Sequence, residues 1–279
     1  MMEPVVVGTD GSSFATRAVV WAAQDAALRD RRLHIVVSTH RLFDGPRDAC
    51  GTGEHGGSVL EQAVEVAHQW QPGLNISTEL SHEPVAAMLG AQARSSAEIV
   101  IGHRGRDGFS GMLLGSTGLR VAGQVPGPVV VVRGEPMDAH GAVLVGVDLF
   151  DVDEPSLAYA CEAATARGAR LDVVGVWLVP STFLNGGYPV IIKRALDDAR
   201  GRVHELAAPW RGKFPDLNII ARAVPGHPVG TLADLSARAD LVVVGSRGLG
   251  AVRSAFAGSV SHGVMQYARC PVAVVRPRA

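Results

Sequence analysis

Short apolar runs alternate with longer segments of mixed polarity along the whole chain. In the first half, five runs rich in Val, Ile and Leu predict buried strands, and the segments between them carry small apolar residues at helical spacing, which predicts helices. The strands are predicted at residues 4–10, 33–39, 74–80, 98–101 and 129–132, and the helices at residues 12–30, 58–71, 84–96 and 115–124. Residues 41–57 are rich in Gly, Asp and Pro, so we expect a long loop there.

The same order of elements occurs again in the second half, where strands are predicted at residues 142–148, 171–177, 241–244 and 272–275, and where residues 217–219 repeat residues 74–76 at the start of the third strand. The spacing from Asp10 to Leu33 is 23 residues, and so is the spacing from Asp148 to Leu171. The interval between the second and third strands is 41 residues in the first half and 46 in the second, so the difference in length lies around one loop and helix. We therefore predict a tandem duplication, with one domain at residues 1–136, a second at 137–279 and a linker within 134–141.

The alternation of strands and helices predicts an α/β fold in each half, because parallel strands need crossover helices, which cover both faces of the sheet. We expect two tandem, doubly wound, five-stranded parallel sheets with strand order 3-2-1-4-5. In such sheets ligands lie at the carboxyl ends of the strands that flank the reversal of direction, here strands 1 and 4. These strands end at Asp10 and Gly102 in the first half and at Asp148 and Gly245 in the second, so an acid and a glycine loop should converge on one cleft.

The loop after the fourth strand carries a glycine motif in both halves. Gly102-His103-Arg104-Gly105 is followed by nine residues and Gly115-Ser116-Thr117, and Gly245-Ser246-Arg247-Gly248 is followed by nine residues and Gly258-Ser259-Val260. Glycine lets backbone N–H groups approach a ligand without a Cβ in the way, and Gly-Ser at a helix start favours an anion. Each copy could therefore cradle phosphates, although the glycines could also simply make turns. Neither half contains the P-loop pattern Gly-x4-Gly-Lys-Ser/Thr.

Composition narrows the class of protein. The chain has 279 residues, 47% of them hydrophobic, and its formal net charge is −1, so it lacks the basic surface that binds nucleic acid. No apolar run approaches the ~18 residues that span a bilayer, and the N-terminus lacks the features of a signal peptide. The three cysteines are far apart and odd in number, which predicts neither a disulfide framework nor a metal site. We expect a cytoplasmic protein with no membrane span and no nucleic-acid partner.

Three stretches carry a resemblance to a known family. They are the segment 6–12 (Val-Val-Gly-Thr-Asp-Gly-Ser), the glycine motif in both halves, and the ending 270–276 (Cys-Pro-Val-Ala-Val-Val-Arg). On these marks the chain resembles the universal stress proteins, specifically the tandem two-domain kind common in actinobacteria, over essentially its whole length. The resemblance implies a Rossmann-like, adenine nucleotide alpha hydrolase-like fold. It also implies a nucleotide-dependent stress regulator or sensor that holds ATP in each domain, and a homodimer paired through the closing strands at residues 129–132 and 272–275.

The resemblance also assigns site residues. Asp10 and Asp148 would hold the ribose or the edge of the adenine, and Ser38 and Val176 would line the adenine pocket. The positions expected near the ribose and phosphates are Gly102, Gly105, Gly245 and Gly248. Those expected to donate hydrogen bonds to phosphate are Gly115, Ser116, Thr117, Gly258, Ser259 and Val260. Gly8 and Gly146, near the ends of the first strands, complete the predicted set.

The second half departs from the family pattern after Asp148, where the usual Gly-Ser is replaced by residues 149–155, which add three carboxylates. One interpretation is that Asp153 or a neighbour caps the following helix while the acids face water. The other is that these acids repel phosphates, so that the second domain binds ATP more weakly or needs Mg²⁺.

No residue stands out as a general base or a nucleophile, so we do not expect a fast enzyme. His103 lies in the glycine loop, but no serine or cysteine nucleophile is placed with it by spacing. Arg104, Arg106 and Arg247 could reach phosphates or face water. Two alternatives stay open: a slow ATP-hydrolysing or adenylating enzyme on the same fold, and a structural protein without nucleotide, in which the motif survives only as turns.

Overall fold

The computed structural model describes residues 2–40, 53–105, 114–134, 139–178, 189–246 and 258–278. The chain divides into two compact units, one formed by Met1–Arg133 with Pro277–Ala279 and the other by Gly134–Arg276. The predicted boundary between residues 136 and 137 lies outside the described residues and stays a prediction. In the described part of the chain, no helix combines the length and apolar composition needed to cross a bilayer.

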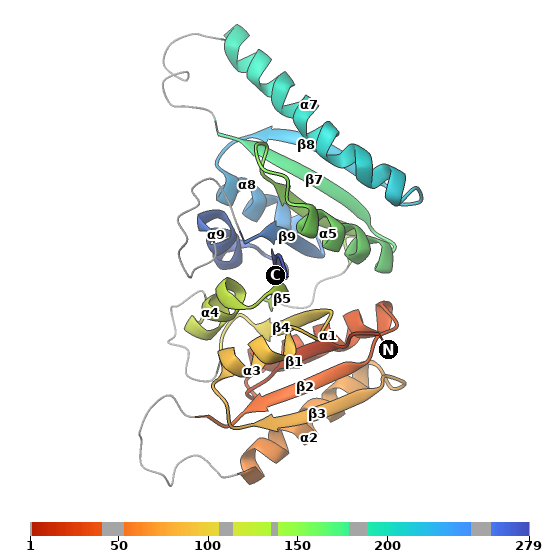
Figure 1. Ribbon diagram of the computed structural model, residues 1–279, viewed down its shortest axis with the longest axis vertical. Coiled ribbons are helices and arrows are strands. Elements are labelled where there is room, and N and C mark those ends of the chain that lie inside the picture. The colour runs from red at the N-terminus through yellow and green to blue at the C-terminus, as the bar shows by residue number, and fades with distance from the viewer. Residues whose placement is uncertain are drawn as a thin grey trace. The chain divides into compact units, whose positions relative to one another are not determined.

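Unit 1 alternates strands and helices in the order expected from the sequence (Figure 1). Its strands are β1 (Val5–Gly8), β2 (Leu33–Ser38), β3 (Ile76–Ser81), β4 (Glu98–Gly102) and β5 (Gly127–Val132). Its helices are α1 (Ser13–Leu28), α2 (Gly53–Trp70), α3 (Val85–Gln92) and α4 (Ser116–Gln124).

Unit 2 repeats this order. Its strands are β6 (Ala142–Val147), β7 (Arg170–Trp177), β8 (Ile219–Pro225), β9 (Leu241–Gly245) and β10 (Val272–Arg276). Its helices are α5 (Glu154–Ala166), α7 (Pro189–Lys213), α8 (Pro228–Leu235) and α9 (Ser259–Tyr267), with the short 3₁₀ turn η1 (Ser236–Arg238) after α8.

The strands of unit 1 lie in the order β3-β2-β1-β4-β5, and those of unit 2 in the equivalent order β8-β7-β6-β9-β10. All described pairings within each unit are parallel. In unit 1, Val5 pairs with Leu33 on one side and Glu98 on the other, which puts β1 between β2 and β4. The predicted strand order 3-2-1-4-5 is confirmed in both halves.

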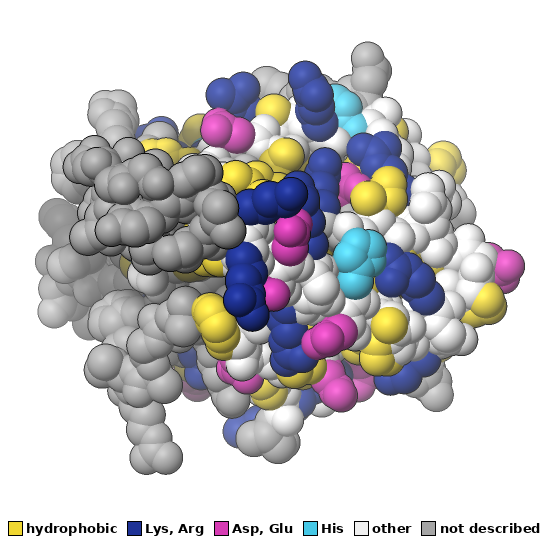
Figure 2. Space-filling view, turned by 90° about the horizontal axis from the view of Figure 1, so that it is seen from above, with side chains coloured by type: hydrophobic (Ala, Val, Ile, Leu, Met, Phe, Trp, Pro, Cys, Tyr) yellow, Lys and Arg dark blue, Asp and Glu magenta, His cyan; other side chains and the backbone are white. Residues whose placement is uncertain are grey.

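Helices cover both faces of each sheet, as the continuous apolar strands require. In unit 1, α1 packs with α2 on one face and α3 packs with α4 on the other; α5 with α7 and α8 with α9 repeat this in unit 2. Central strands are therefore fully buried, as Val5, Val6 and Val7 show. On the side seen in Figure 2, basic and acidic side chains lie among one another.

One element begins earlier than the sequence indicates. Helix α2 starts at Gly53 rather than at residue 58, so it includes Gly56, which packs closely against the sheet. A Cβ on Gly56 would lie 2.6 Å from Leu80 Cδ1 and 3.0 Å from Thr39 Cγ2, so a residue with low helix propensity is used here to bring the helix near β3. Helix α7 has 25 residues against 18 in α2, so the second half has the longer helix within the longer interval.

Candidate functional site

The carboxyl ends of β1 and β4 bring an acid and a glycine loop together in unit 1. Strand β1 ends at Gly8, and Thr9 continues its pairing by donating from its backbone N–H to the Val36 carbonyl at 3.0 Å. A Cβ built on Gly105 would lie 2.7 Å from Asp10 Oδ2, so the loop backbone runs directly past that carboxylate. The convergence predicted from topology is therefore present in the structure.

The turn after β1 orients the Asp10 carboxylate. Asp10 Oδ1 accepts a hydrogen bond from the Ser12 N–H at 2.9 Å, while Gly11, at φ +77°, donates to Thr9 Oγ1 at 3.2 Å. Ser12 then caps α1 by accepting from the Ala15 N–H at 3.3 Å. The Asp10 side chain is exposed at this turn.

Gly102 serves the packing of α1. A Cβ at this position would lie 2.7 Å from the Phe14 carbonyl oxygen and 3.0 Å from the Ala15 nitrogen, so the first turn of α1 fills the space that the glycine leaves. A Cβ on Gly8 would meet only ordinary contacts with Leu89 and Ile101. The two glycines of the loop thus differ, since Gly102 faces the protein backbone and Gly105 faces Asp10.

One hydrogen bond ties the two ends of the glycine loop together. The Gly115 N–H donates to the His103 carbonyl at 2.8 Å, and the His103 N–H donates to the Val132 carbonyl at 3.0 Å. Gly115 is the N-cap of α4, and no side chain caps this helix. The first-turn N–H groups, from Ser116 and Thr117 onward, therefore have no partner within the helix and can donate to an anion.

Aromatic and cationic side chains flank this loop. The rings of Phe14 and His103 meet edge to face at 4.5 Å between centroids, and the guanidinium groups of Arg104 and Arg17 lie 5.4 and 5.5 Å from the Phe14 ring centre. Burial lowers the pKa of His103 despite its contact with the Val132 carbonyl, and nearby arginines lower it further. The site thus combines a neutral imidazole with two guanidinium charges.

Arg17 and Phe14 were not among the predicted site residues. They stand three residues apart within the first five residues of α1, just after the turn that carries Asp10. Residues at this spacing share one helix face, and that spacing was the signal in the sequence that could have found them.

Ser38 lies at the end of β2, beside β1. Its hydroxyl donates to the Glu83 carbonyl at 2.6 Å and accepts from the His40 N–H at 3.3 Å. The Ser38 hydroxyl is therefore used to join β2 to the segment before α3.

Unit 2 repeats the frame of the site. Asp148 Oδ1 accepts from the Phe150 N–H at 2.9 Å, as Asp10 does from Ser12. The Gly258 N–H donates to the Ser246 carbonyl at 3.1 Å and precedes α9 without a side-chain cap. Gly248, Arg106 and Arg247 lie outside the described residues, as does the side chain of Ser116. Of the remaining predicted residues, Thr117 and Ser259 are exposed, and Val260 is half-buried.

The helix cap that follows β6 is an acid, Asp153, whereas the cap that follows β1 is Ser12. Asp153 is the N-cap of α5, where its Oδ1 accepts from the Ser156 N–H at 3.3 Å and its Oδ2 accepts from the Ser156 hydroxyl at 2.6 Å. A Cβ on Gly245 would lie 1.9 Å from Asp153 Oδ2, so this carboxylate rests against the end of β9. The interpretation of Asp153 as a helix cap agrees with this geometry, which also puts a negative charge beside the glycine loop.

The rest of that segment is held by unit 2 itself. Leu149 is buried against Gly175, and the Leu149 carbonyl accepts from Arg202 Nε at 3.1 Å, whereas Phe150 is 76% exposed. Two predicted site positions lie nearby in the sheet. One is Val176, which is half-buried near the end of β7. The other is Gly146, where an added Cβ would lie 2.8 Å from Leu232 Cδ1, so the absence of a side chain leaves room for Leu232.

Comparison with known proteins agrees with this arrangement. The model of the Universal stress protein family matches residues 1–133 and again residues 140–276. A universal stress protein of Mycolicibacterium smegmatis is 33% identical over 291 residues, covering 98% of this chain and 97% of the relative. A universal stress protein of Mycobacterium tuberculosis is 30% identical over 299 residues, covering 98% and 94%.

Solved structures share the fold across both units. A universal stress protein from Archaeoglobus fulgidus aligns with a TM-score of 0.66 at 18% identity, over 99% of this chain and 96% of that one. A functionally unknown protein from Pseudomonas aeruginosa aligns with a TM-score of 0.67 at 15% identity, over 99% and 93%. The two matches to the family model and the relatives over 98% of the chain show that the chain belongs to the universal stress protein family, with the family domain present twice in tandem.

Proposed function

We propose that unit 1 binds an adenine nucleotide, ATP in the first place, at the carboxyl ends of β1 and β4. The observation that carries this proposal is the approach of the Gly105 backbone to the Asp10 carboxylate, beside the uncapped start of α4. A carboxylate accepts hydrogen bonds from ribose hydroxyls, whereas helix N–H groups donate to phosphate oxygens. The two kinds of group therefore match the two ends of a nucleoside phosphate.

The charges around the loop support the same ligand. Arg17 and Arg104 lie beside the loop and would offset phosphate charge, since guanidinium groups form strong bonds to phosphate. We propose that unit 2 holds a second, weaker site, because Asp153 adds a carboxylate next to Gly245. Mg²⁺ bound with the phosphates would reduce that repulsion.

Nucleotide binding would make the chain a regulator or sensor in the stress response. A bound nucleotide stabilises whichever conformation it prefers and so changes the surface offered to a partner. His103 is held neutral, but its imidazole Nδ1 lies 3.2 Å from the Val132 carbonyl, so this nitrogen is not free to act as a base. Association of two chains through the closing strands, and residence in the cytoplasm, remain predictions of this proposal.

The first test is the nucleotide that the purified protein carries. Freshly purified chain is denatured, and any released nucleotide is identified by chromatography and counted per chain. About one equivalent of ATP supports a single working site per chain, and about two support both sites. Mostly ADP favours the slow hydrolase, and an empty protein that binds no added ATP with Mg²⁺ in calorimetry rules out the nucleotide proposal.

The second test separates the Asp10 carboxylate from general effects on charge. We expect Asp10→Ala to weaken ATP binding about tenfold or more, because a hydrogen bond to a charged group contributes about 1.5–3 kcal/mol. Asp216→Ala is the matched control, since Asp216 is exposed and lies outside the site. Equal affinities of the two variants in calorimetry would contradict a role for Asp10.

A further inference from the structure

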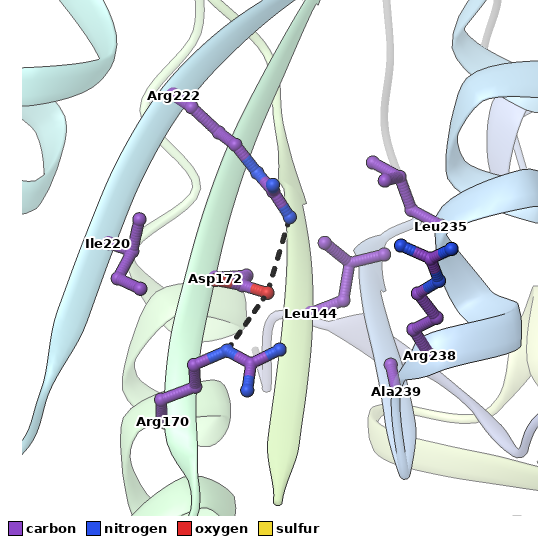
Figure 3. A pocket seen from close by; sticks show the side chains of 8 residues that line it. All are labelled: Leu144, Arg170, Asp172, Ile220, Arg222, Leu235, Arg238 and Ala239. Atoms are coloured by element: carbon purple, nitrogen blue, oxygen red, sulfur yellow. Dashed lines mark hydrogen bonds and ion pairs between the residues drawn. The ribbon is translucent and has the colours of Figure 1, made fainter. Parts of the chain in front are cut away.

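A cavity of about 220 Å³ opens in unit 2 on the side of the sheet that α8 covers. Figure 3 shows its walls, which come from β6, β7 and β8 on one side and from the end of α8 and η1 on the other. Arg170 is the first residue of β7 and Ile220 the second of β8, so the cavity lies toward the amino ends of the strands. The candidate nucleotide site lies at the opposite, carboxyl ends.

Positive charge exceeds negative charge in this cavity. Arg222 Nη2 lies 3.2 Å and Arg170 Nε lies 3.5 Å from the same oxygen, Oδ2 of Asp172. Figure 3 shows these two arginines reaching Asp172 from opposite sides. Arg238 lines the cavity as a third cation, and within the described residues no carboxylate lies at ion-pair distance from it. Three guanidinium groups therefore line a cavity in which Asp172 supplies the one carboxylate, and two of them pair with it.

Asp172 is buried, whereas the guanidinium groups around it remain open to a ligand. The Asp172 side chain is only 9% exposed, but the side chains of Arg170 and Arg222 are 38% and 42% exposed, and Arg238 is exposed. Each guanidinium group has five N–H donors and no acceptor, so two ion pairs to one carboxylate oxygen leave donors of this cluster for another group. This excess of donors points to an occupant that accepts hydrogen bonds.

The repeat supplies an internal comparison. By strand register, Asp172 corresponds to His34 and Arg222 to Glu79, since Val143, Leu171 and Ile219 pair as Val5, Leu33 and Ile76 do. In unit 1 the Glu79 carboxylate has polar partners. It lies 3.4 Å from His34 Nε2 and accepts a hydrogen bond from Gln92 Nε2 at 2.8 Å.

The corresponding place in unit 1 therefore has a carboxylate with its partners, whereas unit 2 has arginines in excess. The cluster cannot be explained as a requirement of the shared fold. It is a feature of unit 2 alone.

We propose that this cavity binds a small phosphate-bearing anion. A tetrahedral dianion offers several oxygens to guanidinium groups that approach from different strands, and Arg binds phosphate in a bidentate manner. The volume lies below the ~300–1,000 Å³ of sites for drug-sized ligands, which excludes a whole nucleotide. Leu144, Ile220 and Leu235 add an apolar wall that suits a short carbon chain.

The proposal is tested by titrating the full chain with inorganic phosphate in a calorimeter. We expect Arg238→Gln and Arg222→Gln each to weaken phosphate binding at least about tenfold. Arg194→Gln, on the exposed surface of α7, is the matched control and should bind as the unchanged chain does. Phosphate binding should also persist when the chain is saturated with ATP, which distinguishes this cavity from the proposed nucleotide sites.

Three outcomes would overturn the proposal. They are no binding of millimolar phosphate by the unchanged chain, equal binding by the Arg238→Gln and Arg194→Gln variants, and tighter binding of succinate than of any phosphate.

Arg238 has no ion-pair partner among the described residues, so its variant should keep the thermal unfolding midpoint of the unchanged chain in phosphate-free buffer. A raised midpoint in phosphate, lost in Arg238→Gln, would support the site. Ethyl phosphate binding tighter than inorganic phosphate would identify a phosphomonoester, and the reverse order would identify free phosphate.

Discussion

Gly102 ends β4 at a point where the backbone of α1 leaves no room for a side chain. A methyl group there would lie 2.7 Å from the Phe14 carbonyl oxygen, and neither group can rotate away. We therefore expect Gly102→Ala to lower the free energy of unfolding by about 1–3 kcal/mol, the usual cost of forcing extra volume into a packed site. Urea unfolding followed by circular dichroism measures the change.

Gly90 provides the matched control for this substitution. It lies inside α3, and a Cβ there would have no atom within 4 Å. Gly90→Ala should stabilise the protein by up to about 1 kcal/mol, because alanine has the higher helix propensity. If both variants shifted the unfolding midpoint in the same direction, the tight contact at Gly102 would not be the cause.

His103 makes the stability of the protein depend on pH. The fold holds the pKa of His103 below its ordinary value of 6.5, mainly through burial. As pH falls below that value, the unfolded chain binds more protons than the folded one, so the free energy of unfolding decreases. Above that value this residue has no such effect.

When the pH is lowered from about 7 to about 5, we expect the free energy of unfolding to decrease less for His103→Gln than for the unchanged chain. Urea unfolding at the two pH values measures this difference. His204→Gln is the control, because His204 is exposed on α7. A pH dependence that His103→Gln leaves unchanged would show that other groups cause it.

Element α1 is joined to β4 by a buried cluster of charges. Arg29 Nε lies 2.6 Å from Asp25 Oδ2 and Arg29 Nη2 lies 3.7 Å from Glu98 Oε2, and both carboxylates are almost fully buried. Unit 2 has Leu241 at the position of Glu98, so the cluster is not needed by the fold itself.

We expect Arg29→Met to cost about 3–5 kcal/mol of unfolding free energy, because it leaves two buried carboxylates without this cation. Glu98→Leu copies unit 2 and keeps the pair of Arg29 with Asp25, so it should cost much less. Arg32→Met, at an exposed position, controls for the loss of one surface charge. Equal urea midpoints for the Arg29 and Arg32 variants would show that the cluster contributes little.

The elements were predictable where burial is simple. Strands buried on both faces are continuously apolar, so the α/β class and the order of elements along the chain followed from the sequence. The meeting of Asp10 with the glycine loop followed once the strand order 3-2-1-4-5 of a doubly wound sheet was assumed. The start of α2 did not, because the reason for Gly56 is a contact with Leu80 from a distant strand. The role of Gly102 against α1 and the excess arginines of unit 2 were missed for the same reason. Each depends on residues far apart in the chain.

The molecule as a whole carries the same arrangement of strand ends and glycine loop twice, with different charges at the helix cap after the first strand. The N-cap after β1 is the neutral Ser12, and the N-cap after β6 is Asp153, whose carboxylate lies against Gly245. The tandem repeat thus keeps one fold twice while, on the proposed function, its two sites bind a phosphate ligand with different strength. On the proposed function, the charge of Asp153 sets that difference.

Asp153→Ser should therefore strengthen ATP binding by unit 2, because serine keeps the helix cap that Ser12 provides in unit 1 and removes one negative charge. A repulsion on the order of 1 kcal/mol corresponds to roughly a fivefold gain in affinity, and the gain should shrink when Mg²⁺ or salt is added. Calorimetry with ATP in an Asp10→Ala background isolates the second site, and Asp216→Ser in the same background is the control. If Asp153→Ser bound ATP no better than Asp216→Ser in low salt without Mg²⁺, the weakness of the second site would have to arise elsewhere than in its helix cap.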